Sequence, residues 1–136
     1  MTPPTINTTT PSVDMPTMPV VIEHAMRRSG VNYYRALDLP LDTYADQAAR
    51  ADCLAAACAE RASCWAALAS WVSSPGSTVP WPLVSAVLAA RRREDDAARF
   101  WRDTAIYWRR AAAGADPREL DAEDLGLLDH QGRWVS

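Results

Sequence analysis

The sequence predicts an all-α fold, in which a long antiparallel helical hairpin (residues 41–73 and 81–114) and a short N-terminal helical segment form a small helical bundle. Apolar and small residues recur at alternating spacings of three and four for more than four heptads over residues 41–73. A second amphipathic run of similar length covers residues 81–114. The segment SSPGS between them has strong turn chemistry, and a short connection makes two long helices antiparallel neighbours.

The 136 residues are enough for one domain. Residues 1–19 are rich in Thr and Pro with little to bury, which predicts a disordered arm. The helical domain is expected over residues 20–116. Residues 117–136 form an acidic C-terminal tail.

The N-terminal helical segment, residues 20–39, is expected to consist of two short helical pieces. Ser29 and Gly30 are expected to separate them, because glycine readily adopts the left-handed conformation that ends a helix. Pro40 closes the segment, because the residue before a proline avoids the α region.

The first long helix is expected to be capped by Asp42, whose carboxylate also suits the positive end of the helix dipole. Two seams of small or apolar residues follow a seven-residue period along it, and the small residues allow a second helix to approach closely. The first seam contains Leu41, Ala48, Ala55, Ala62 and Ala69, and the second contains Tyr44, Ala51, Cys58, Trp65 and Val72.

The second long helix is expected to begin within a residue or two of Pro82, because proline is tolerated only in the first turn. Gly114 and Pro117 are expected to end it. Its predicted apolar face contains Leu83, Val87, Ala90, Ala97, Ala98, Trp101, Ala105, Trp108 and Ala112.

Glu94 falls in the middle of this apolar face, and a bare buried carboxylate is costly. If Val72 lies opposite Leu83 across the turn, the antiparallel register places Arg61 opposite Glu94. We therefore expect a structural ion pair between Arg61 and Glu94 that fixes the register, in preference to a catalytic acid in a pocket.

The composition restricts the function classes. All 14 basic residues are Arg, which indicates a GC-rich bacterium or its phage or mobile element. The net charge of −3 provides no overall basic field, so nucleic acid is the less favoured partner. No apolar segment is suited to a membrane span, and an odd number of cysteines favours free thiols in a reducing cytoplasm.

No catalytic residue, metal site or cofactor is predicted. The sequence has no phosphate-binding loop, dinucleotide-binding glycine motif, nucleophile elbow or HExxH motif, so a non-enzymatic protein is expected. On one helix, Cys53, Cys58 and Cys64 point in different directions or lie too far apart to close a tetrahedral metal site.

Residues 21–39 resemble the helix-turn-helix pattern of bacterial repressors in their small residue, turn glycine and following apolar positions, although one residue too many separates Ala25 from Gly30. The resemblance covers fewer than 20 residues and implies a small DNA-binding transcriptional regulator. The side chains that would face DNA are Asn32, Tyr33, Tyr34 and Arg35. The alternative, which the departure favours, is that this segment packs on the hairpin.

The preferred hypothesis is a non-enzymatic protein–protein interaction or assembly protein, which forms a homo-oligomer or is a subunit of a complex. Both long helices have apolar or small residues on their outer sides, which a single hairpin neighbour does not cover. The expected interface contains Cys64, Trp71, Leu88, Phe100 and Ile106. A third hypothesis is a ligand pocket among Tyr44, Trp101 and Trp108.

Overall fold

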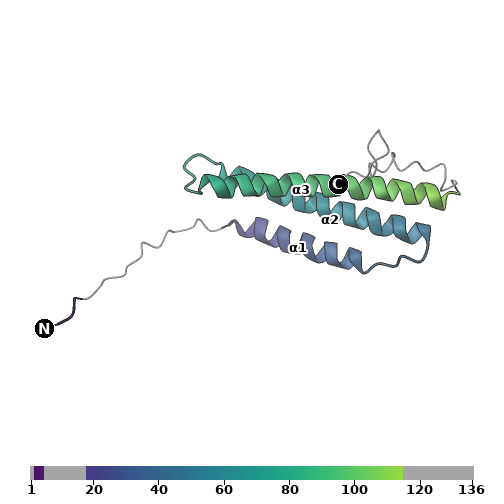
Figure 1. Cartoon of the computed structure of the whole chain (residues 1–136), viewed down its shortest axis with the longest axis horizontal. Helices are drawn as coiled ribbons and strands as arrows, with labels where there is room; N and C mark the ends of the chain where they lie inside the picture. Colours follow the sequence, from purple (N-terminus) through teal and green to yellow (C-terminus); the bar gives the residue numbers. More distant parts are fainter. Residues whose placement is uncertain (1, 5–17, 115–136) are drawn as a thin grey trace.

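The computed structural model describes residues 2–4 and 18–114, which contain three helices: α1 (Val20–Leu37), α2 (Tyr44–Val72) and α3 (Trp81–Ala112). No strand occurs in these residues. As Figure 1 shows, α2 and α3 form the long antiparallel hairpin and α1 runs back along α2. The predicted all-α hairpin with an N-terminal helical segment is therefore confirmed. The predicted acidic tail and most of the predicted arm lie outside the described residues.

The three helices do not form a closed triangle. The backbones of α1 and α3 each pack against α2 but do not adjoin one another. Consequently α2 is the central helix, and its buried positions face two neighbours. Most of them are small: Ala48, Ala51, Leu54, Ala55, Ala57, Cys58, Ala62, Cys64, Leu68, Ala69 and Val72.

The predicted break at Ser29 and Gly30 is wrong, because α1 is one continuous helix through both residues. Gly30 does not have a positive φ, so it does not end a helical piece. Ser29 is fully buried, and its hydroxyl donates to the Met26 carbonyl at 2.8 Å within the same helix. Packing of this small residue against α2 outweighs the local preference of glycine for a break.

The predicted cap at Asp42 is also wrong, because Thr43 caps α2. The Asp46 N–H donates to the Thr43 hydroxyl at 3.0 Å, and the Thr43 N–H donates to the Asp46 carboxylate at 3.3 Å. This reciprocal capping box satisfies two backbone donors at once, which a single acid does not. Leu41 therefore precedes the helix and is exposed, whereas the other members of its predicted seam are buried.

The connection between α2 and α3 follows the predicted turn chemistry. Gly76 adopts φ +81°, and Pro82 lies in the first turn of α3 as expected. The fully buried positions of α3 are fewer than on α2: Val84, Ala98, Ala105 and Ala111.

Replacing Gly30 with alanine should stabilise the protein by roughly 0.5–1 kcal/mol, because a helical glycine loses more backbone entropy than alanine on folding. A Cβ at Gly30 meets no atom within 4 Å, so no clash opposes this gain. Thermal unfolding of Gly30→Ala measures the effect. The matched control is Gly76→Ala, which should destabilise the protein because φ is +81° there. A destabilised Gly30→Ala variant would mean that α1 breaks at Gly30.

Candidate functional site

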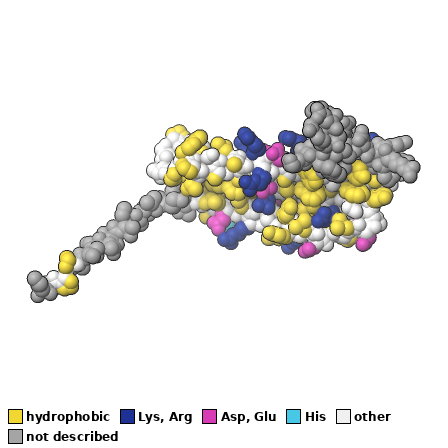
Figure 2. Space-filling view, in the orientation of Figure 1, with side chains coloured by type: hydrophobic (Ala, Val, Ile, Leu, Met, Phe, Trp, Pro, Cys, Tyr) yellow, Lys and Arg dark blue, Asp and Glu magenta, His cyan; other side chains and the backbone are white. Residues whose placement is uncertain are grey.

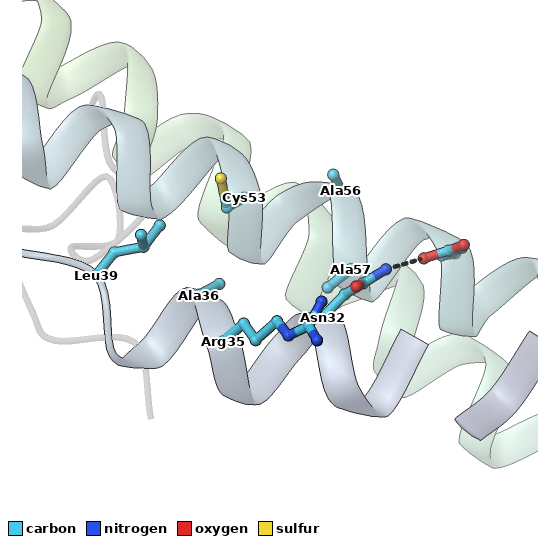
Figure 3. A pocket seen from close by; sticks show the side chains of 8 residues that line it. Asn32, Arg35, Ala36, Leu39, Cys53, Ala56 and Ala57 are labelled. Carbon is cyan, nitrogen blue, oxygen red and sulfur yellow. Dashed lines mark hydrogen bonds between the residues drawn. The ribbon is translucent and has the colours of Figure 1, made fainter. Parts of the chain in front are cut away.

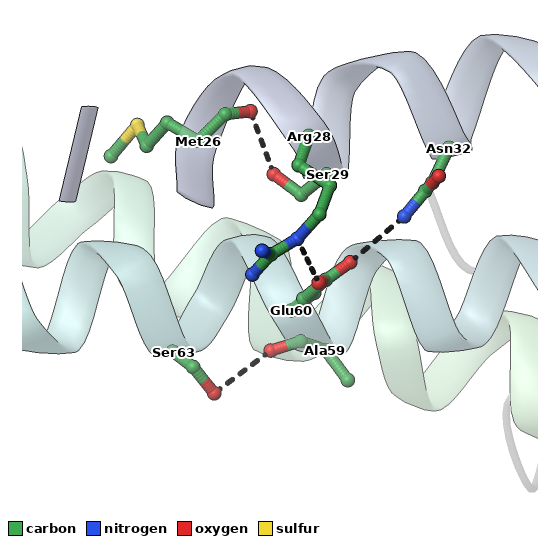
Figure 4. Close-up of polar contacts among 7 residues, drawn as sticks. All are labelled: Met26, Arg28, Ser29, Asn32, Ala59, Glu60 and Ser63. Carbon is green, nitrogen blue, oxygen red and sulfur yellow. Dashed lines mark hydrogen bonds and ion pairs between the residues drawn. The ribbon is translucent and has the colours of Figure 1, made fainter. Parts of the chain in front are cut away.

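Two adjacent charged residues stand in the middle of α2 and face different neighbours. Glu60 faces α1, where its carboxylate accepts from Arg28 Nε at 3.2 Å and from Asn32 Nδ2 at 3.3 Å (Figure 4). These contacts supply two donors to a carboxylate that is about half-buried. Their role is to join α1 to α2 in a defined register.

Arg61, the next residue, faces α3. Its Nε lies 3.2 Å from Glu94 Oε1, so the ion pair expected from the antiparallel register is present. The Glu94 side chain is only 15% exposed, so the pair is partly desolvated. The guanidinium also lies 5.8 Å from the centre of the Tyr33 ring, so Arg61 contacts both α1 and α3.

Arg50 makes the same kind of bridge three turns earlier. Its Nε donates to the Leu37 carbonyl near the end of α1 at 3.4 Å, and its guanidinium lies 5.9 Å from the centre of the Trp101 ring on α3. Because eleven residues are close to three full helical turns, Arg50 and Arg61 lie on the same side of α2. Along this side, the two arginines link α1 and α3, whose backbones do not adjoin.

The next position at this eleven-residue spacing along α2 carries no arginine that could link α1 to α3. Three turns after Arg61 stands Val72, which is buried. Around it lies an open cavity of about 300 Å³. We call this cavity the hairpin-end groove. It is lined entirely by apolar residues: Met18, Trp65, Leu68, Trp71, Val72, Val79, Leu83, Ala86 and Val87.

The hairpin end lacks charge along α2, the turn and α3, whereas the adjacent start of α1 carries Glu23 and Arg27. No Asp, Glu, His, Lys or Arg occurs between Arg61 and Arg91, a signal in the sequence that hydrophobic periodicity does not register. In Figure 2, hydrophobic side chains gather where α2 turns into α3, and charged side chains first appear farther along α3. Several large apolar side chains are exposed at this end: Val20 (62%), Val21 (81%), Trp81 (71%), Leu83 (44%) and Leu88 (44%).

A second cavity of about 350 Å³ lies between α1 and α2 (Figure 3). Its polar groups include Asn32 and Glu60, which already hydrogen-bond to each other, together with Arg35. The remaining walls are alanine, leucine and cysteine: Ala36, Leu39, Cys53, Ala56 and Ala57. Both oxygens of the Glu60 carboxylate in this cavity accept hydrogen bonds from side chains of α1.

The expected interface residues do not form one surface. Cys64 was a wrong prediction, because it is only 6% exposed and α1 packs over that side of α2. Leu88 and Ile106 are exposed on one side of α3, five turns apart. Phe100 is exposed about 120° away at ~100° per residue, and its ring packs edge-on against Trp101. Of the five residues, Trp71 alone lines the hairpin-end groove.

The helix-turn-helix interpretation of residues 21–39 is wrong as a structural prediction, since one continuous helix replaces the two helices and the turn. Two of the four residues expected at DNA contact the bundle instead: Asn32 binds Glu60, and Tyr33 lies under Arg61. Tyr34 and Arg35 are exposed.

In the region where the third hypothesis places a ligand pocket, the side chains of Tyr44, Trp101 and Trp108 make packing contacts. Tyr44 stacks on Trp108 with ring centres 5.5 Å apart and an interplanar angle of 27°. Trp101 is covered by Arg50. These side chains therefore pack α2 against α3 at the end opposite the turn.

The three cysteines are free thiols in different environments. Cys53 is exposed, whereas Cys58 and Cys64 are buried. Burial raises the pKa of Cys58 and of Cys64, and the carboxylates of Glu94 and Glu60 respectively raise them further. Among the described residues, no group of three or more His, Cys, Asp or Glu side chains is placed to hold a metal ion. None of the three described helices combines the length and apolar character that a membrane span requires.

Comparison with known proteins identifies no relative: no family model, curated protein or solved structure matches this chain. The function must therefore be inferred from the residues of the chain itself.

Replacing Glu94 with alanine should lower the free energy of unfolding by about 1 kcal/mol, because Arg61 then loses its carboxylate partner in a partly desolvated position. Glu94→Gln should cost less, since it keeps a polar group of the same size beside Arg61. Chemical denaturation measures both. The control is Glu23→Ala, which removes an exposed pair with Arg27 and should cost less than about 0.5 kcal/mol. Equal effects of Glu94→Ala and Glu23→Ala would contradict a structural role for the pair.

Iodoacetamide should modify Cys53 rapidly in the folded protein, and Cys58 and Cys64 only after unfolding. Since the folded-state pKa of both buried thiols is raised, their contribution to stability is complete below the unfolded thiol pKa and is lost as the pH rises through the folded value. The melting temperature should therefore fall at alkaline pH. The fall should be shallower in a Cys58→Ala, Cys64→Ala variant, and an equal slope would contradict the assignment.

Proposed function

We propose that this protein is a non-enzymatic assembly protein, which binds a protein partner through the hairpin-end groove. The observation that carries the proposal is the open apolar groove at the position where the series Arg50, Arg61 ends in Val72. Elsewhere along this side of α2, the protein's own side chains link α1 to α3. At the hairpin end, Ile22 and Met26 of α1 pack against the buried cluster of Leu68, Val72 and Val84, and the groove beside this cluster stays open.

The chemistry of the groove supports a protein partner. Aromatic and aliphatic side chains with few charges are typical of the centre of a protein interface. Trp65 and Trp71 line the groove, and tryptophan is enriched among residues that dominate binding energy. A surface that exposes several large apolar side chains around one end is a usual mark of an interaction site.

A photo-reactive amino acid at Leu83, which lines the groove and is 44% exposed, tests the proposal in cells that express the full chain in its native host. We expect a discrete protein adduct on irradiation. The matched control places the same amino acid at Ser85, an exposed residue about 160° away around α3 at ~100° per residue.

The control should give at least roughly tenfold less adduct, because its side chain faces away from the groove. The Ala90→Asp substitution, next to Arg91 where the charged part of α3 begins, gives a second check. It should lower the yield of the adduct from Leu83 and leave the helicity unchanged. Absence of an adduct at Leu83, or equal adducts at both positions, would contradict docking through the groove.

A further inference from the structure

We infer that the occupant of the hairpin-end groove is the uncharged hairpin end (residues 62–90) of a second copy of this chain, in a two-fold symmetric, antiparallel arrangement. The inference rests on the proposed function and names its partner. Closed two-fold dimers are the commonest protein assemblies, and their interface is the same patch on both subunits.

Charge selects the second copy's hairpin end as the matching surface. The groove has no charged residue to pair with, so a partner must bring an uncharged surface or bury an unpaired charge. Residues 62–90 are free of charge, whereas the described helices on either side of this stretch carry arginines and acids throughout. When residues 62–90 of two copies meet, no charge within these residues has to be buried and no like charges oppose each other.

The pattern on α3 fits an antiparallel partner. Leu83, Ala86, Val87 and Ala90 recur at spacings of three and four on the groove side of its first turns, and the alanines allow a close approach. If two copies of α3 cross near Ala86, Leu83 of each lies near Ala90 of the other. Arg91, Arg92 and Arg93 then begin where the overlap ends and remain in water.

The extent of the contact between the two copies determines the affinity that we expect for the dimer. The contact is confined to Met18, the last turns of α2, the connection and the first turns of α3. Since a standard stable interface buries ~800 Å² per partner and this contact involves only a few helical turns, we expect dissociation in the micromolar range. A chemical trap is therefore the appropriate measurement.

The experiment uses the full chain with Cys53→Ser, which leaves the two buried thiols and removes the exposed one. Ala86→Cys, at the rim of the groove, should be linked by a short bis-maleimide into a species of twice the chain mass at about 100 µM protein. The matched control is Ser85→Cys, one residue away and turned by ~100° around α3, outside the groove lining. Its yield should be at least roughly tenfold lower.

Adding Leu83→Asp to the Ala86→Cys chain should abolish the link, because a carboxylate would be buried without a partner at the interface. Circular dichroism shows whether this variant keeps its helicity. If it does not, Ala90→Asp, at an already partly exposed position, replaces it. No link at Ala86→Cys, equal yields at both cysteines, or a link that survives the acidic substitution would overturn the inference.

The two proposals fail separately. If the photo-reactive residue at Leu83 gives an adduct in cells but the purified chain is not linked at Ala86→Cys, the groove binds a different protein and the second-copy inference is wrong. If the purified chain is linked and the adduct in cells has twice the chain mass, both proposals hold. If neither experiment gives a product, both are wrong.

Discussion

The structure depends on one constraint, which is that α2 must pack against two neighbours that do not adjoin one another. Its buried positions are mostly alanine and cysteine, and small side chains let helix axes approach to the lower end of the ~8–10 Å range. Burial of alanine alone contributes little hydrophobic free energy per residue, so the bundle gains from close backbone contact and from a few large residues such as Leu54, which has no exposed surface. A larger side chain along α2 would displace a neighbouring helix.

Helices with alanine seams slide past one another easily, because successive turns present nearly the same surface. The polar contacts remove that freedom. Glu60 fixes α1 through Arg28 and Asn32, and Arg61 fixes α3 through Glu94. A slip of one turn, ~5.4 Å, would separate both sets of partners and leave partly desolvated charges unpaired. In this bundle, ion pairs and hydrogen bonds therefore determine the register of the helices, and small side chains determine how closely the helices approach.

The hairpin and its ion pair could be predicted from the sequence because both follow from periodicity. The seven-residue seams define the helices, and the antiparallel register then fixes which residue faces Glu94. The continuity of α1 could not be read locally, because Gly30 signals a break and only the burial of Ser29 against α2 outweighs it. The errors at Cys64 and at the DNA-binding segment have the same origin, since an N-terminal segment divided in two is too short to cover α2. The groove could not be predicted from periodicity, because the period of apolar residues does not record that charged residues are absent between Arg61 and Arg91.

Folding alone does not require the groove. Val72 belongs to the buried cluster with Leu68 and Val84, but the exposed positions around the groove could carry charge at little cost to stability. Instead, valine lies at the floor of the groove, and Trp81 is 71% exposed nearby. An exposed apolar patch without charge is a usual mark of an interaction site. Exposing such a surface to water is unfavourable, and the proposed partner would recover this cost by covering it.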